Sequence, residues 1–198
     1  VKVPHAEEDK ANKTLRCYHS HPMDKKELAI RIANTAILHG DFTLRSGRKS
    51  TWYIDKYLFT TKPDILRELG TLFATKIPKT TTLLAGAELG GIPLVTTAAM
   101  ATNLPCIFIR NQKKEYGTAQ QLEGVLQAED KVVIVEDIAT TGGQVIEAAT
   151  TIQELGGRVV SIIAVIDRCE GAWGGGRGSS GDGSGGHGRV GRAVWWEV

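Results

Sequence analysis

Hydrophobic residues along the chain follow two alternating patterns: short apolar runs typical of buried strands, and longer stretches with apolar residues at helical spacing. A succession of strands and helices of this kind predicts an α/β fold, with an open and mostly parallel sheet flanked by helices and joined by right-handed crossovers. The expected strands are 82–86, 105–109, 132–135 and 159–166, and the expected helices are 28–38, 63–77, 93–102 and 145–155.

Two further patterns mark the N-terminal part of the chain. Asp24, followed by Glu27, has the form of a helix N-cap and predicts where the first helix begins. The segment 41–58 alternates between polar and apolar residues on both sides of Ser46 and Gly47. This alternation predicts short strands joined by a turn.

The two ends of the chain lack these patterns. Residues 1–22 are polar and irregular, so we expect a disordered extension upstream of a natural start near Met23. From residue 172 onward the composition changes to glycine and serine, which bury too little apolar surface to offset the entropy of ordering. We therefore expect one domain at 23–171 and an atypical glycine-rich tail at 172–198.

The overall composition narrows the class of protein. Charges nearly balance, with 24 Lys and Arg against 22 Asp and Glu, so nothing indicates a nucleic acid or a membrane surface as a partner. No apolar run approaches the roughly 20 residues that a membrane-spanning helix needs. The three cysteines, Cys17, Cys106 and Cys169, are widely spaced, which is typical of reduced thiols in a cytoplasmic protein.

The strongest candidate for chemistry follows the strand expected at 132–135. Glu136 and Asp137 are the first residues past it, and carboxylates suit a sugar diol or the outer shell of Mg²⁺. The loop 140–143 adds hydroxyls and glycines, which let a phosphate approach the backbone where the next helix begins. The loop lacks both the Walker A sequence and the spacing of a dinucleotide fingerprint. The alternative interpretation is an ordinary strand–turn–helix connection with a threonine N-cap.

Four segments of the sequence resemble those of type I phosphoribosyltransferases, and together they resemble the orotate phosphoribosyltransferase family. They correspond to a substrate hairpin, a pyrophosphate-side loop, a mobile catalytic loop and the motif for 5-phosphoribosyl 1-pyrophosphate (PRPP). The resemblance extends over about 23–171, and it implies the type I fold with a small substrate hood at about 23–60. The four segments are 42–55 (FTLRSGRKSTWYID), 85–93 (AGAELGGIP), 110–118 (RNQKKEYGT) and 132–143 (VVIVEDIATTGG).

The resemblance implies an activity and the partners it needs. The 5-phosphoribosyl group of PRPP would pass to orotate, giving orotidine 5′-monophosphate and pyrophosphate in pyrimidine biosynthesis. Mg²⁺ would be the cofactor, carried by PRPP oxygens and water near Asp137 without a direct protein ligand. The resemblance also implies a homodimer in which the 110–118 loop acts in the neighbouring site. PRPP and orotate are then the expected partners, with neither nucleic acid nor membrane.

Individual residues on the PRPP side of the site receive roles from the same resemblance. Backbone N–H groups from 139 to 144 would hold the 5′-phosphate, and the adjacent acids would hold the ribose hydroxyls. Basic loop residues would neutralise the leaving pyrophosphate, and the alternative for them is a solvated basic loop. The residues expected in catalysis are Lys113, Lys114, Glu136 and Asp137, and those of the pyrophosphate-side loop are Leu89 and Gly90. The residues expected to bind PRPP are Arg110, Lys114, Tyr116, Glu136, Asp137, Ile138, Ala139, Thr140, Thr141, Gly142, Gly143 and Gln144.

The orotate side of the site is assigned in the same way. Arg168 follows the last expected strand and would pair with the orotate carboxylate in a two-point contact, or else be a solvated arginine. Arg45 stands where the family usually carries a lysine, and it would bridge substrate and phosphates. Tyr53 and Ile54 would offer ring and backbone contacts, or else be one exposed and one buried strand residue. The residues expected to bind orotate are Arg45, Tyr53, Ile54, Thr140 and Arg168.

One position departs from the family pattern. Family members usually carry a lysine directly after the arginine of the mobile loop, and this chain carries Asn111. A neutral amide cannot match a charge-assisted hydrogen bond to a phosphate, so either Lys113 replaces that lysine or activity is weakened. The sequence leaves three alternatives to the orotate enzyme open. They are a phosphoribosyltransferase for another base, a non-catalytic regulator that senses PRPP, and a gene product whose tail prevents folding.

Overall fold

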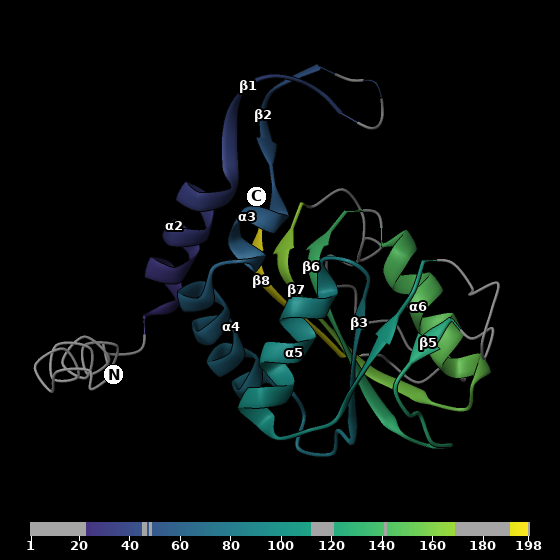
Figure 1. Cartoon of the computed structure of the whole chain (residues 1–198). Coiled ribbons are helices and arrows are strands. Elements are labelled where there is room, and N and C mark those ends of the chain that lie inside the picture. The colour runs from purple at the N-terminus through teal and green to yellow at the C-terminus, as the bar shows by residue number, and fades with distance from the viewer. Residues whose placement is uncertain are drawn as a thin grey trace, which may run out of the picture.

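Within the described residues, a six-stranded sheet forms the centre of the molecule and a two-stranded hairpin projects from one end of it (Figure 1). This computed structural model describes residues 23–44, 47, 49–111, 121–140 and 142–168, together with the backbone of 191–197. Neighbouring strands are parallel except for one pair at an edge, which confirms the expected fold class. The strands, in spatial order, are β5 (Leu122–Glu123), β4 (Cys106–Ile109), β3 (Leu83–Ala87), β6 (Lys131–Ala139), β7 (Arg158–Asp167) and β8 (Gly191–Glu197).

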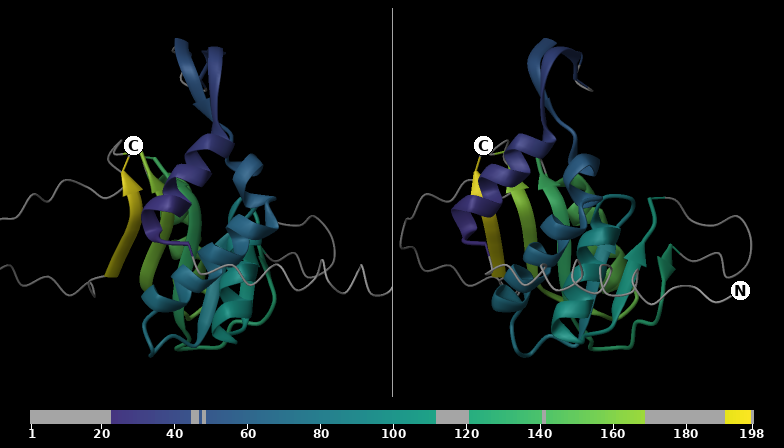
Figure 2. Two further views of the ribbon diagram at one scale, coloured as in Figure 1. Left: turned by 90° about the vertical axis from the view of Figure 1, so that its left-hand side faces the viewer. Right: turned by 60° about the vertical axis from the view of Figure 1, so that its left-hand side comes forward.

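Helices cover both faces of the sheet (Figures 1 and 2). Four of the described helices contribute side chains to one apolar cluster on one face, and α6 (Gly143–Glu154) contributes to a second cluster on the other face. None of the helices in the described ranges is long and apolar enough to cross a membrane. The helices of the first face are α2 (Lys25–Ala36), α3 (Lys56–Thr60), α4 (Pro63–Lys76) and α5 (Gly91–Thr102).

The two apolar clusters show to which face each residue of β6 turns. Val133 and Val135 belong to the cluster that includes α4 and α5, whereas Ile134 belongs to the cluster that includes α6. Successive side chains of a strand turn to opposite faces of the sheet. Glu136 therefore follows Ile134 toward α6, and Asp137 follows Val135 toward α5.

Strand β6 is longer than the sequence predicted. The expected strand ended at Val135, whereas the structure continues it to Ala139, which pairs with Asp167 of β7. Glu136 and Asp137 are therefore residues within the sheet rather than the first residues past the strand. Backbone pairing with β7 sustains this extension, and such pairing leaves no trace in the pattern of apolar residues.

The hairpin and the first helix agree with their sequence patterns. β1 (Ile37–Thr43) and β2 (Lys49–Ile54) pair antiparallel on either side of the expected turn. The helix expected at 28–38 is α2, and Asp24 caps it by accepting a hydrogen bond from the N–H of Glu27 at 2.8 Å. The helix ends at Ala36, however, because Ile37 and Leu38 pair with β2 as the first residues of β1.

Three of the described elements were not predicted from the sequence, and the shortest of them is the two-residue strand β5. Helix α3 follows β2 directly, and the Asp55 carboxylate caps it by accepting a hydrogen bond from the N–H of Tyr57 at 3.0 Å. Strand β8 lies parallel to β7 at the edge of the sheet, within the segment expected to be an atypical tail. Pairing with β8 satisfies N–H and C=O groups along the edge of β7. The tract 169–190 and the expected extension 1–22 lie outside the described residues.

The order of the strands brings two loops together. The chain leaves β3 through α5 toward β4, and it leaves β6 through α6 toward β7, in the opposite direction along the sheet. Because β3 and β6 are neighbours, the strand order reverses between their carboxyl ends. Open α/β sheets bind ligands at such a switch point.

Gly86 in β3 allows this strand to lie close to α5. A Cβ atom at Gly86 would lie 2.6 Å from the carbonyl oxygen of Gly91 and 2.7 Å from Cγ1 of Val95.

We expect Gly86→Ala to lower the free energy of unfolding by about 1–3 kcal/mol through overpacking, measured by urea denaturation. Gly143→Ala is the control, since no heavy atom lies within 4 Å of a Cβ there. Equal destabilisation by both substitutions would contradict the close packing of β3 against α5.

Candidate active site

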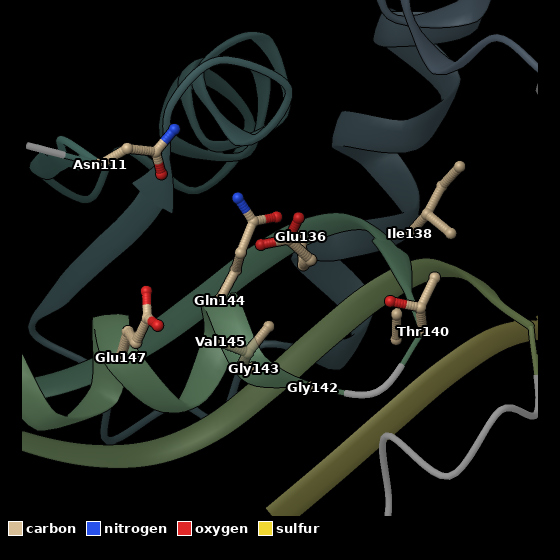
Figure 3. Close-up of a pocket in the computed structure, with 10 residues that line it drawn as sticks. Asn111, Glu136, Ile138, Thr140, Gly142, Gly143, Gln144, Val145 and Glu147 are labelled. Carbon is tan, nitrogen blue, oxygen red and sulfur yellow. The ribbon is translucent and has the colours of Figure 1, made fainter. Parts of the chain in front are cut away.

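A pocket of about 520 Å³ opens at the carboxyl end of β6 and the amino end of α6 (Figure 3). It brings together most of the segment 136–144 that the sequence predicted to bind PRPP. Val145 and Glu147 of α6 also line it and were not predicted. The lining residues are Asn111, Glu136, Ile138, Ala139, Thr140, Gly142, Gly143, Gln144, Val145 and Glu147.

The first turn of α6 forms one wall of this pocket. Gly142 has a φ of +81°, a left-handed conformation that glycine adopts without strain, and its carbonyl accepts the N–H of Ile146 at 2.9 Å. The N–H groups of a first helical turn have no acceptor within the helix, and the helix dipole favours an anion beside them. Gly143 has open space where a Cβ would stand. The wall can therefore accept a phosphate group.

Glu136 of β6 lines the pocket together with Gln144 of α6 (Figure 3). The residue is 5% exposed, and its Oε2 has no hydrogen-bond partner within the described part of the chain. Burial, and next the negative charge of Asp137, raise the pKa of Glu136 to about 8. A hydroxyl group or a hydrated cation brought by a ligand would supply the partner that Oε2 lacks.

Asp137 is not among the residues that line the pocket. Its side chain is 1% exposed, and its Oδ2 lies 2.8 Å from Nζ of Lys56. Its Oδ1 accepts a hydrogen bond from the N–H of Ile138 at 2.6 Å. A Cβ atom at Gly90 would overlap Oδ2, so the turn before α5 closes over this carboxylate. The two acids, which were expected to bind one ribose together, therefore have different surroundings: Glu136 lines the pocket, and Asp137 is held by Lys56.

Lys56 is a site residue that the sequence analysis missed. It is the first residue of α3, and its side chain is 29% exposed. Burial lowers the pKa of Lys56, but the charge of Asp137 and the hydrogen bond to it outweigh this effect, so the pKa lies above its usual value. A lone lysine after a strand gives no signal in the sequence, because the fold alone brings it to Asp137.

The turn between β3 and α5 carries the two residues expected on the pyrophosphate side. Leu89 is 61% exposed, and Gly90 lies against Asp137. Asn111, just after β4, is bound to this turn: its N–H donates to Oε1 of Glu88 at 2.7 Å, and its side-chain amide donates to the Glu88 carbonyl at 3.4 Å. Because Asn111 also lines the pocket, the turn, the pocket and the start of the expected mobile loop meet at this residue.

Arg110, the first residue of the expected mobile loop, is hydrogen-bonded to Gln121, which lies just beyond the end of that loop. The N–H of Arg110 donates to the carbonyl of Gln121 at 2.8 Å, and the side-chain amide of Gln121 donates to the carbonyl of Arg110 at 2.9 Å. The guanidinium of Arg110 lies 3.6 Å from the carboxylate of Glu123, and Arg110 does not line the pocket. Five residues predicted for the site lie outside the described residues: Arg45, Lys113, Lys114, Tyr116 and Thr141.

The hairpin meets the end of β7 at Arg168, the residue predicted to bind the orotate carboxylate. The N–H of Arg168 donates to the carbonyl of Ala139 at 3.0 Å, and its guanidinium carbon lies 5.9 Å from the centroid of the Trp52 ring. This is the geometry of a cation–π contact. Tyr53 is 45% exposed and Ile54 is buried. Trp52 was not predicted as a site residue, because nothing in its neighbourhood in the sequence indicates that it faces Arg168.

Comparison with known proteins places these features in a family. Residues 59–172 match the family model described as "Phosphoribosyl transferase domain". An orotate phosphoribosyltransferase of Methanocaldococcus jannaschii is 43% identical over 152 residues, which cover 76% of this chain and 86% of that relative. The orotate phosphoribosyltransferase of Natronomonas pharaonis is 44% identical over 137 residues, covering 69% of this chain and 78% of the relative.

The fold of this chain is also similar to those of solved orotate phosphoribosyltransferase structures. The crystal structure of Mycobacterium tuberculosis H37Rv orotate phosphoribosyltransferase in complex with Fe(III) dicitrate has a TM-score of 0.72 at 25% identity, covering 89% of this chain and 97% of that chain. The orotate phosphoribosyltransferase of Aeropyrum pernix has a TM-score of 0.66 at 25% identity, covering 89% and 94%.

Buried Glu136 makes the stability of the ligand-free chain depend on pH. Its pKa is about 8 in the folded chain and about 4.3 in an unfolded one, so between these values the folded state binds more protons. The free energy of unfolding therefore falls as the pH rises from about 5 to about 8.5, by roughly 2 kcal/mol or more. Denaturation across this range should show the loss, and Glu136→Gln should remove most of it.

Glu147→Gln is the matched control for this measurement. Glu147 lines the same pocket but is exposed, so its substitution should leave the pH dependence of the parent chain unchanged. If Glu136→Gln and the parent lose stability equally over this range, the carboxylate of Glu136 does not carry the dependence.

Proposed function

This chain belongs to the phosphoribosyltransferase family, and from its orotate phosphoribosyltransferase relatives we propose that it transfers the 5-phosphoribosyl group of PRPP to orotate. The products are orotidine 5′-monophosphate and pyrophosphate, in a step of pyrimidine biosynthesis. The observation that supports this most is the pocket at the carboxyl end of β6, which a buried carboxylate and the first turn of α6 line together.

The chemistry requires positioning and charge more than a reactive side chain. A bond forms between N1 of orotate and C1 of the ribose as the bond from C1 to the pyrophosphate oxygen breaks. The electron pair leaves with pyrophosphate, and the N1 proton is lost to water or to the leaving group. Positive charge develops at C1, and negative groups nearby stabilise it. Holding the two substrates in line supplies much of the remaining acceleration.

PRPP occupies the pocket in this proposal. Its 5′-phosphate binds the backbone N–H groups at the start of α6, from 139 to 144, and its ribose hydroxyls donate to Glu136. The unpartnered Oε2 of Glu136 supports this assignment. Asp137 contributes negative charge from the other face of β6, where Lys56 holds its carboxylate.

Orotate lies between the hairpin and the end of β7. Arg168 pairs with its carboxylate in a two-point contact, and the Trp52 ring lies beside the guanidinium. Tyr53 is exposed on the same strand as Trp52 and can contact the pyrimidine ring. Arg45, Ile54 and Thr140 complete the expected set of orotate contacts.

The acids of the pocket fit a Mg²⁺ ion that enters with PRPP. Glu136 and Glu147 both line this pocket, while no group of three or more His, Cys, Asp and Glu side chains in the described ranges could hold a metal ion. We therefore assign Mg²⁺ mainly to PRPP oxygens and water, with these carboxylates accepting hydrogen bonds from its water shell. When bound, Mg²⁺ neutralises charge on the pyrophosphate. The sequence analysis placed the ion near Asp137, whose carboxylate is bound to Lys56 in the structure.

The 110–118 loop supplies the remaining positive charge. In the proposal Lys113 and Lys114 neutralise the departing pyrophosphate, with Arg110 and Tyr116 as further PRPP contacts, and the loop excludes water from the reacting centre. The hydrogen bonds between Arg110 and Gln121 join the start of the loop to the segment that follows it. We also propose a homodimer in which this loop serves the neighbouring site.

An assay of pyrophosphate release tests the proposed function. The chain is incubated with PRPP and Mg²⁺, and with orotate, adenine, hypoxanthine or no base. We expect release with orotate only, together with a higher melting midpoint when PRPP and Mg²⁺ are present, because a ligand that binds the folded state stabilises it. Turnover of a purine without turnover of orotate would establish the enzyme for another base. A raised midpoint without any turnover would establish the PRPP-sensing regulator.

Asn111 is the position at which activity is expected to be improved. We expect Asn111→Lys to raise kcat, because an ammonium at the edge of the pocket makes a charge-assisted contact with the leaving pyrophosphate that an amide cannot make. Asn34→Lys on α2 is the control, since it adds the same charge at an exposed position. An unchanged kcat in Asn111→Lys would mean that Lys113 or Lys114 already supplies this charge.

A further inference from the structure

Lys56 and Asp137 form a buried ion pair to which no role in the reaction has been assigned beyond charge. Nζ of Lys56 lies 2.8 Å from Oδ2 of Asp137, and the two side chains are 29% and 1% exposed. A Cβ atom at Gly90 would overlap Oδ2 and lie 3.2 Å from the same Nζ. The pair is therefore enclosed between β6, α3 and the turn that precedes α5.

Helix α3 holds Lys56 in place from the opposite side. Asp55 caps the helix through the N–H of Tyr57, and the side chains of Phe59 and Thr60 are buried, with Phe59 at 0% exposure. Helix α3 is thus anchored at both ends, and its anchoring fixes the backbone position of Lys56, its first residue. A side chain that extends from a fixed backbone into an enclosed contact can hold its partner in one orientation.

We propose that Lys56 is a positioning residue for the two acids: its ammonium fixes the Asp137 carboxylate against the turn at Gly90 and supplies the positive charge that Asp137 and Glu136 share. This inference rests on the proposed transfer from PRPP, in which Glu136 accepts hydrogen bonds from the ribose. Two adjacent carboxylates buried without a counter-charge retain a proton between them. A protonated Glu136 would have one fewer acceptor oxygen for the ribose hydroxyls.

The charged groups around Glu136 support this role. Burial and then Asp137 raise the pKa of Glu136, whereas Lys56 lowers it, and Glu147 of α6 lines the same pocket. Lys56 itself faces Asp137, Glu136 and the Tyr57 ring, whose centroid lies 5.6 Å from Nζ. The pKa of Lys56 is raised despite burial, so the ammonium keeps its charge over the whole range in which Glu136 titrates. Without this charge, the burial of Glu136 and the negative charge of Asp137 would raise the pKa of Glu136 further.

The first test needs no substrate. The carboxyl ¹³C signal of Glu136, identified by its loss in Glu136→Gln, reports the apparent pKa of that side chain in the full ligand-free chain. We expect Lys56→Met to raise this pKa by about one unit, and Lys56→Arg to return it toward the parent value. Lys62→Met is the matched control, since Lys62 is exposed and makes no side-chain capping bond to α4. Lys56→Gln, which keeps an N–H donor for Asp137 without the charge, replaces Lys56→Met if the latter does not fold.

The second test follows the pH profile of kcat/KM for PRPP with orotate as acceptor. A pKa one unit higher leaves about tenfold less ionised Glu136 at neutral pH. We therefore expect about a tenfold lower kcat/KM in Lys56→Met at pH 7, with recovery toward the parent as the pH rises. Lys56→Arg and Lys62→Met should follow the parent profile.

The outcomes separate this inference from the proposed function. An unchanged pKa of Glu136 in Lys56→Met or Lys56→Gln overturns the inference, and so does a loss of kcat/KM that is equal at every pH, because both indicate a purely structural lysine. A shifted pKa in a chain that does not turn over orotate supports the positioning of the acids and rejects the proposed function. A parent active on orotate whose Lys56 variants keep its profile supports the function and rejects the inference.

Discussion

The backbone pairing of β6 with β7 continues to Ala139, opposite Asp167, and it decides to which face of the sheet each of the two acids turns. Because side chains alternate along a strand, Glu136 comes to the pocket beside α6 while Asp137 comes to α3 and the turn before α5. A shift of one residue in this register would exchange the two acids and would turn the whole apolar set of β6 to the wrong faces. The core and the site therefore depend on the same hydrogen bonds.

The arrangement places two carboxylates where water is largely excluded, which is unfavourable unless each has a partner. The chain meets this constraint in two ways, with an ammonium beside Asp137 and with a raised pKa for Glu136. The raised pKa of Glu136 means that the ligand-free chain is less stable at neutral pH than at acidic pH, where this carboxyl group is protonated. Unfavourable groups of this kind persist at functional sites because a bound ligand removes the penalty.

Local sequence patterns predicted the parts of the fold that depend on local physics. The β-branched run 132–135 identified a strand buried on both faces, and Asp24 identified the start of the first helix. The pocket residues that fall within 136–144 could be predicted because they lie close together in the sequence, so one motif contains them.

Contacts between distant segments could not be predicted in this way. The extension of β6 past its apolar run depends on pairing with β7, and β8 depends on the edge that β7 offers. Lys56 and Trp52 belong to the site through their contacts with Asp137 and Arg168, which lie far along the chain. Such contacts arise only in the tertiary fold, so neither hydrophobic periodicity nor a local motif predicts them.

The direct passage from β2 into α3 limits how the hairpin can move. Ile54 is buried in the core and Lys56 is bound to Asp137, and these two anchors are only about 7 Å of extended chain apart. The base of the hairpin therefore cannot swing outward without pulling one anchor from its place. Bending is left to the outer part, where the register of β1 against β2 shifts between His39 and Phe42. The part of β2 next to α3 therefore keeps its position beside Asp137, while the paired residues beyond the irregularity are not fixed by these two anchors.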